Sequence, residues 1–189
     1  MKKSELVYSY ILEQRLENKR KSMTQAEIAA KLNLSLSIVN AAILRLKKMN
    51  AVRVNLRSFD IVDAKKILYY WSSVRDVGKD IIYSTRVDDS ASGIEKSVPP
   101  GFIYAAYTAY KMKFNDVPAD YSEVYVYGDM EAAKKRFSPS KNRPNLFVMK
   151  PGPDRITIAN IFADLWNMKE WYAKDFLSAL EVRINGILE

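Results

Sequence analysis

The residues that could carry out chemistry in this sequence are its carboxylates, lysines, tyrosines and hydroxyls, because its 189 residues include no histidine and no cysteine. Their absence excludes thiol nucleophiles, thiolate zinc sites, imidazole metal ligands and every Ser-His-Asp or Cys-His arrangement. Only a metal that prefers oxygen ligands, such as magnesium, would suit the side chains that remain. Most classes of enzyme are therefore excluded before any motif is considered.

Two acidic pairs have a spacing that could hold magnesium. Asp88 and Asp89 are adjacent in a stretch rich in Ser and Gly, where acids are usually solvated turn residues. Asp129 and Glu131 follow a predicted strand as an Asp-x-Glu pair, which resembles the Asp-x-Asp of nucleotidyltransferases without the Gly-Ser turn before it. A helix N-cap and first turn explain both acids equally well. We therefore expect no metal, no cofactor and no enzymatic activity; a magnesium-dependent nucleotidyltransferase-like enzyme is the weakest alternative.

Positive charge is concentrated in the first third of the chain. The whole sequence has 30 Lys and Arg against 22 Asp and Glu, a formal net charge of +8. Residues 1–62 contain 12 basic and 5 acidic residues, a net charge of +7, whereas residues 63–189 carry +1. This asymmetry indicates an N-terminal module that contacts a polyanion and a second module with another role.

The basic region has the pattern of three helices followed by a hairpin. Thr24 is a favourable N-cap, and Glu27 stands three residues later as in a capping box. The expected elements are helices over 4–19, 24–32 and 36–49 and short strands over 52–55 and 59–62. This order is that of a winged helix-turn-helix, and residues 23–54 resemble the helix-turn-helix of many prokaryotic transcription regulators.

The third helix predicts a face that reads DNA. At about 100° per residue, one side collects Val39, Ala42, Ile43, Leu46 and Met49, and the other collects Ser37, Asn40, Ala41, Leu44 and Lys48. On the second side the Asn40 amide could pair with adenine, and Ala41 or Leu44 could contact a thymine methyl. The flanking cations Arg45, Lys47 and Lys48 would contact phosphates, and Arg57 at the wing tip would reach the minor groove or its backbone. The expected DNA-binding residues are Thr24, Gln25, Ser35, Ser37, Asn40, Ala41, Leu44, Arg45, Lys47, Lys48, Arg53 and Arg57.

Two of these residues leave an alternative open. Asn40 fits a solvated helix position as well as a base-reading one. Leu44 is an apolar residue on a face expected to meet DNA, and it also fits a surface for a partner protein or for a second copy of the chain.

The remainder of the chain predicts an α+β fold, in which a small mixed α/β domain follows the winged helix-turn-helix. We expect domains over 1–62 and 81–189, with a connecting helix and linker over 63–80. Asp63 is expected to cap a helix over 64–73, and residues 88–101 are expected to form a loop. The other expected elements are strands over 81–84, 124–127 and 145–149 and helices over 102–112, 130–137, 158–166 and 171–188.

Three segments of the second domain resemble the C-terminal domain of AbiEi-like antitoxins, a prokaryotic family here of archaeal type. They are the strand Val-Tyr-Val-Tyr at 124–127, Asn-Leu-Phe-Val-Met-Lys-Pro-Gly at 145–152, and the helical residues 158–167 and 171–181. The family joins a winged helix to such a domain. The resemblance implies a partner toxin of nucleotidyltransferase type and repression of the protein's own promoter.

These observations lead to one expectation and one alternative. We expect a sequence-specific regulator of transcription, acting as a repressor on double-stranded DNA, with a C-terminal domain for protein or effector contact. Inverted operators favour a homodimer. The alternative is an antitoxin or interaction module that binds a partner protein, with DNA binding secondary or lost. Acidic and basic residues interrupt the first 15 positions and no apolar run approaches about 20 residues, so we expect a cytoplasmic protein without membrane association.

Overall fold

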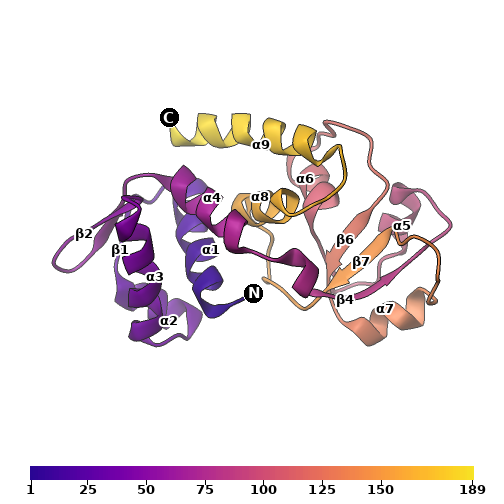
Figure 1. Cartoon of the computed structure of the whole chain (residues 1–189), viewed down its shortest axis with the longest axis horizontal. Coiled ribbons are helices and arrows are strands. Elements are labelled where there is room, and N and C mark those ends of the chain that lie inside the picture. Colours follow the sequence, from indigo (N-terminus) through magenta and orange to yellow (C-terminus); the bar gives the residue numbers. More distant parts are fainter. The chain divides into compact units, whose positions relative to one another are not determined.

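Helices predominate in the computed structural model, which describes all 189 residues. The fold is mixed α and β, with 51% helix, 12% strand, nine α-helices and two small sheets (Figure 1). None of the helices combines the length and the apolar character needed to cross a membrane. The chain divides into two compact units: unit 1 contains Met1–Arg75, Thr157–Ala159 and Ile187–Glu189, and unit 2 contains Asp76–Ile156 and Asn160–Gly186.

Unit 1 contains four helices and a three-stranded antiparallel sheet. Its elements are α1 (Lys3–Leu16), β1 (Ser22–Met23), α2 (Gln25–Leu32), α3 (Leu36–Lys48), β2 (Val52–Val54), β3 (Phe59–Ile61) and α4 (Ala64–Val74). The predicted hairpin is confirmed, with Val52 opposite Ile61 and Val54 opposite Phe59. The strand order is β1-β3-β2, and β1 was not predicted because its two residues carry no periodic pattern of their own.

The turn between α2 and α3 is defined by local caps. The Thr24 hydroxyl accepts a hydrogen bond from the Glu27 backbone N–H at 3.1 Å, so the predicted N-cap is confirmed. The Glu27 carboxylate pairs with Arg20 at 2.6 Å and does not complete a capping box. At the other end of α2, Asn33 adopts a left-handed conformation (φ 51°), and the Leu34 N–H bonds to the Ala29 carbonyl at 2.9 Å.

Helix α4 belongs to the core of unit 1. The predicted Asp63 cap is confirmed, because its carboxylate accepts from the Lys66 N–H at 3.0 Å. The apolar side of α4, which includes the fully buried Trp71, packs against α1. Unit 1 therefore extends to Arg75, whereas the sequence predicts a first domain that ends at residue 62 and a connecting segment over 63–80. Burial of a continuous apolar stripe makes α4 part of the first unit and not a linker.

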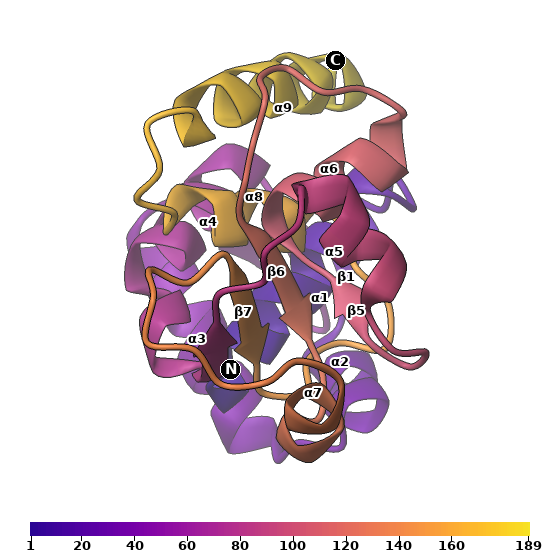
Figure 2. The ribbon, with the colours of Figure 1, turned by 90° about the vertical axis from the view of Figure 1, so that its right-hand side faces the viewer.

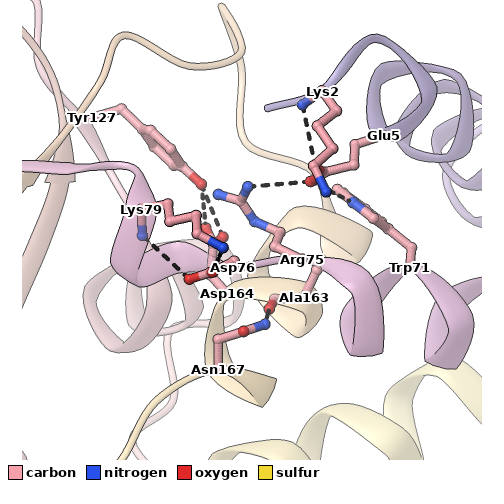
Figure 3. Close-up of polar contacts among 10 residues, drawn as sticks. All are labelled: Lys2, Glu5, Trp71, Arg75, Asp76, Lys79, Tyr127, Ala163, Asp164 and Asn167. Atoms are coloured by element: carbon pink, nitrogen blue, oxygen red, sulfur yellow. Dashed lines mark hydrogen bonds and ion pairs between the residues drawn. The ribbon is translucent and has the colours of Figure 1, made fainter.

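A buried ionic cluster connects α1 with the end of α4 (Figure 3). The Glu5 carboxylate accepts from the Arg75 guanidinium and from the Trp71 indole N–H, both at 3.4 Å. It also accepts from the Lys2 backbone N–H at 3.2 Å, which completes a capping box at the start of α1. The Glu5 and Arg75 side chains are 5% and 1% exposed, so the pair is shielded from water.

Unit 2 is built around a four-stranded sheet of order β4-β7-β6-β5 (Figure 2). Strands β6 and β7 are parallel, and the other two pairs are antiparallel. Its strands and 3₁₀ helix are η1 (Val77–Lys79), β4 (Ile81–Thr85), β5 (Ile103–Tyr104), β6 (Val124–Tyr127) and β7 (Leu146–Met149). Its helices are α5 (Ala91–Ser97), α6 (Ala106–Phe114), α7 (Met130–Arg136), α8 (Ile158–Trp166) and α9 (Ala173–Leu188). The first residues of α8 and the last residues of α9 belong to unit 1.

Helices cover both faces of this sheet. On one face, Val126 and Val148 belong to an apolar core that includes Ile94 of α5 and Ala133 of α7, and Figure 2 shows α5 and α7 on the near side of the sheet. On the other face, the Tyr127 hydroxyl donates to the fully buried Asp164 of α8 at 2.7 Å (Figure 3). The phenol of Tyr127 is thus one hydrogen-bond partner of this buried carboxylate.

Two predicted elements differ from the structure. The loop expected over 88–101 contains α5, since Ser90 accepts from the Gly93 N–H at 3.2 Å and Ile94 is buried. The helix expected over 102–112 is replaced by β5 and then α6, which runs to Phe114. Ile103 pairs with Tyr127 across the sheet, and this long-range pairing outweighs the local helical pattern.

We expect the replacement of Gly128 by Ala to destabilise unit 2 by about 1–3 kcal/mol, because the added methyl would lie 2.1 Å from the Phe102 ring. The matched variant is Gly186→Ala on α9, where nothing lies within 4 Å of the added carbon. Removing a helical glycine there should stabilise the protein by roughly 0.5–1 kcal/mol. Thermal unfolding of the two variants should therefore shift in opposite directions; equal shifts would contradict the close packing at Gly128.

Candidate nucleic-acid interface

Helix α3 has one buried side and one exposed side, as its periodicity predicts. Four of the five residues expected on the core side are fully buried, and the fifth, Met49, is half-buried just after the helix ends. Ser37, Asn40, Ala41, Leu44 and Lys48 are all exposed and follow one another along the opposite side. The structure therefore brings these five predicted residues together on a single solvent-facing strip, which we call the α3 face.

The amino-terminal end of the α3 face carries two hydroxyls. Ser35 precedes the helix in an extended conformation, and its Oγ lies 3.0 Å from the Oγ of Ser37. No side chain caps this helix end, so its first backbone N–H groups have no side-chain acceptor. Such a helix end favours an anionic group.

Three cations occupy the last turn of α3, and all three are exposed. Lys48 lies on the α3 face and Lys47 lies beside it, at positions suited to phosphate contact. Arg45 marks the other border, because its guanidinium is close to the hydroxyls of Tyr8 on α1 and Tyr70 on α4. Those two rings meet edge to face with their centroids 5.6 Å apart. The aromatic pair thus limits the α3 face on the side of α1 and α4.

The β2–β3 hairpin presents a second exposed group. Its turn is closed by the Asn55 N–H, which bonds to the Ser58 carbonyl at 2.8 Å, and Leu56 and Arg57 are exposed at the tip. Arg53 is exposed on β2, opposite Asp60 of β3. The Asn55 side-chain amide donates to the Asp60 carboxylate at 3.0 Å and holds the pKa of that acid below its usual value. Asp60 therefore stays ionised opposite Arg53, although the two form no ion pair, and Arg57 lies exposed at the tip of the hairpin.

A hollow of about 270 Å³ joins three parts of unit 1. It is lined by Thr24, Gln25 and Ala26 at the start of α2, by Leu36 at the start of α3 and by residues 54–58 of the hairpin. The structure thus places the predicted residues Thr24, Gln25 and Arg57 around one depression, beside the end of α3 at which the α3 face begins.

Sequence reasoning missed the exposed leucines at this depression. Leu36 is 56% exposed and Leu56 is 97% exposed, and neither was among the expected contact residues. The available signal was their position, because the first residue of a helix and the tip of a hairpin rarely reach a core. Together with Leu44, which is 45% exposed, they place three large apolar side chains on this surface.

The acids considered as magnesium ligands have other partners. Asp129 accepts from the Ala132 N–H at 2.8 Å and caps α7, as predicted, and Glu131 pairs with Lys134 at 3.0 Å. Asp88 is an exposed surface residue that pairs with Arg86, and Asp89 accepts from the adjacent Ser90 N–H. The structure contains no group of three or more acidic side chains placed to hold a metal ion.

Comparisons of the chain with protein-family models, with curated proteins and with solved structures found no match. What the interface does must therefore be inferred from the side chains and geometry of this chain alone.

Proposed function

We propose that the protein is a sequence-specific DNA-binding regulator of transcription that acts as a repressor, with unit 1 serving as a winged helix-turn-helix. One observation carries the proposal: the α3 face is continuous, exposed and bordered by cations, and the depression beside it leads to Arg57 at the hairpin tip. In this proposal α3 is the recognition helix and the β2–β3 hairpin is the wing.

The chemistry of each position supports a division of tasks. Asn40, near the middle of the α3 face, has the amide that pairs bidentately with adenine, and Ala41 or Leu44 can contact a thymine methyl. The hydroxyls of Ser35 and Ser37 and the start of α2, with Thr24 and Gln25, supply hydrogen bonds to the phosphate backbone. The cations Arg45, Lys47, Lys48 and Arg53 contact phosphates, and Arg57 at the wing tip reaches the minor groove.

The distribution of charge agrees with this proposal. Residues 1–62 carry a net charge of +7, although the chain as a whole carries +8. The cations that border the α3 face, Arg45, Lys47 and Lys48, form no ion pair with an acid, so they are available to neutralise phosphates. A homodimer on an inverted repeat would place two such faces in successive major grooves.

We expect Asn40→Ala and Lys48→Ala to affect DNA binding in different ways. Loss of the Asn40 amide should reduce discrimination at one base pair by about 1–3 kcal/mol while leaving non-specific binding unchanged. Loss of the Lys48 charge should weaken binding to every sequence alike and reduce the salt slope by about one unit. Gel-shift titrations against an operator selected from random sequences, and against its single-base variants, would measure both effects.

Lys66→Ala is the matched control for these variants, because Lys66 is an exposed lysine on α4, outside α2, α3 and the hairpin. It should bind DNA like the unaltered protein. If Asn40→Ala and Lys48→Ala gave the same loss on all sequences, the assignment of Asn40 to base reading would be refuted.

The three exposed leucines favour a second candidate function, binding of a partner protein as in the antitoxins that the sequence resembles. Leu36, Leu44 and Leu56 would supply apolar anchors on the same surface. Co-expression with the product of the neighbouring gene tests this alternative. A complex that is lost with Leu44→Asp and Leu56→Asp but kept with Arg57→Ala would favour protein contact; loss of DNA binding with Arg57→Ala and no complex would favour DNA.

A further inference from the structure

At one end of the sheet in unit 2, the last residue of β4 lies beside the first residues of β6 and β7. Thr85, the last residue of β4, pairs with Leu146, the first residue of β7, and Leu146 also pairs with Val124, the first residue of β6. The residues just beyond these positions are Arg86, the segment 143–145 and Ser122–Glu123. Segments that are far apart in sequence are therefore brought together by strand register alone.

Asn145 holds these three strand ends in place. Its side chain is buried and bonds to both the N–H and the carbonyl of Val87, at 2.8 and 2.9 Å. Its backbone N–H bonds to the Thr85 carbonyl at 3.1 Å, and its carbonyl accepts from the Val124 N–H at 2.8 Å. The backbones that carry Arg86, Arg143 and Glu123 are thus anchored through one residue.

A pocket of about 500 Å³ opens at this end of the sheet. It is lined by Arg86, Arg143 and Lys169, by the acids Glu123 and Glu170, and by Trp171 beside Tyr172. Its volume lies within the range of pockets that hold a small ligand. The lining side chains come from four separate segments of unit 2.

The three cations can take up an anion. Arg143 and Lys169 are exposed and form no ion pair. Arg86 pairs only with Asp88, at 3.6 Å, and the Asp88 side chain is 91% exposed, so this contact is a weak surface pair. Two guanidinium groups and one ammonium therefore line the pocket with donors suited to phosphate oxygens.

The two acids of the pocket are already held by tyrosines. The Glu123 carboxylate accepts hydrogen bonds from the Tyr172 and Ser122 hydroxyls, and Glu123 is only 8% exposed. The Glu170 carboxylate accepts from the hydroxyls of Tyr107 and Tyr125, both at 2.9 Å.

Burial, and then the charge of Glu170, raise the pKa of the Tyr107 and Tyr125 phenols well above their usual value. Both phenols consequently stay protonated and keep the carboxylate oriented. A carboxylate fixed in this way repels a bare anion and attracts hydroxyl donors, so the ligand must present both an anionic group and hydrogen-bond donors.

Trp171 adds an aromatic surface. It is 74% exposed, an unusual state for the largest apolar side chain, and it contacts Tyr172 edge to face at 5.5 Å. The indole lines the pocket, and most of its surface remains open to solvent. An exposed indole of this kind is suited to stacking on a planar base.

We propose that this pocket binds a nucleoside monophosphate. The phosphate is held by Arg86, Arg143 and Lys169, the ribose hydroxyls donate to the fixed carboxylates, and the base stacks on Trp171. Inorganic phosphate lacks the donors and the ring, and a nucleoside lacks the charge. The proposal concerns residues of unit 2 only and does not depend on DNA binding by unit 1.

Isothermal titration calorimetry of the full chain with adenosine and guanosine 5′-monophosphates tests this assignment. We expect saturable binding of at least one of them, weakened about tenfold or more by Arg143→Ala and by Trp171→Ala. Lys141→Ala and Trp166→Phe are the matched controls, because both side chains are exposed and neither lines the pocket. Circular dichroism spectra would establish that every variant is folded.

Several outcomes of the titration would overturn the proposal. No saturable heat with either nucleotide at millimolar concentration would overturn the proposal, as would equal affinity for inorganic phosphate or for adenosine. Binding that Arg143→Ala and Trp171→Ala leave unchanged would place the ligand elsewhere and would also overturn it. None of these results bears on the gel-shift experiments with unit 1.

Discussion

Raising the salt concentration from about 50 to about 200 mM is expected to weaken operator binding by a factor on the order of 500. Each phosphate neutralised by Lys or Arg releases condensed counterions, so the logarithm of affinity falls with the logarithm of salt at a slope of about −0.9 per contact. The surface described above offers five such cations, Arg45, Lys47, Lys48, Arg53 and Arg57, all exposed. The expected slope is therefore about −4.5. Fluorescence anisotropy with a labelled duplex at a series of salt concentrations would measure it.

Paired variants make the salt experiment specific to the proposed surface. Replacing both Arg53 and Arg57 by Ala should reduce the steepness of the slope by about two units. Replacing both Lys134 and Lys135 by Ala removes the same charge from α7 of unit 2 and should leave the slope unchanged. Binding that is insensitive to salt, or an equal response of the two double variants, would contradict the assignment of unit 1 as the DNA-binding unit.

The second large effect concerns the stability of unit 1. We expect Arg75→Met to lower the free energy of unfolding by about 3–5 kcal/mol, because it leaves the buried Glu5 carboxylate without its cation. Arg20→Met is the matched control: Arg20 pairs with Glu27 at 2.6 Å, but the two side chains are 42% and 32% exposed. An exposed pair contributes about 0–1 kcal/mol, so this second variant should be nearly neutral.

Trp71 provides a local probe for this comparison. Its indole donates to Glu5, and replacing Trp166 and Trp171 of unit 2 by Phe leaves Trp71 as the only tryptophan of the chain. Urea unfolding followed by its fluorescence then reports on unit 1. Adding Glu5→Gln to Arg75→Met should recover part of the loss, since it removes the uncompensated charge. If Arg75→Met cost no more than Arg20→Met, the buried pair would have no special role.

Several features of unit 1 could be predicted from the sequence because they depend on neighbouring residues. The Thr24 and Asp63 caps form within three residues along the chain, and both are found. The two-sided character of α3 follows from helical periodicity, and the structure exposes Asn40 and its neighbours as expected. The grouping of most candidate DNA-contact residues therefore needed only the helical repeat and the hairpin turn.

Other features depended on residues far apart in the sequence. The pattern over 102–112 is helical by itself, yet Ile103 pairs with Tyr127, so β5 forms there. The sequence places α4 in a connecting segment, but its apolar side is buried against α1 and makes it part of unit 1. At residues 103–104 strand pairing outweighed a local helical preference, which differs between conformations by a smaller free energy. For α4 the helix itself forms as predicted, and only its packing decides the unit to which it belongs.

The sequence by itself determined the absence of histidine and cysteine chemistry, the basic first third, the helical caps and the residues that share the α3 face. Only the tertiary structure decided which side chains meet in unit 2. Arg86, Arg143 and Lys169 show no common pattern along the chain. Arg86 and Arg143 meet because β4 ends where β6 and β7 begin, and Lys169 reaches the same pocket from the segment between α8 and α9. Strand register is set by pairing between distant segments, so no local pattern of residues carries it.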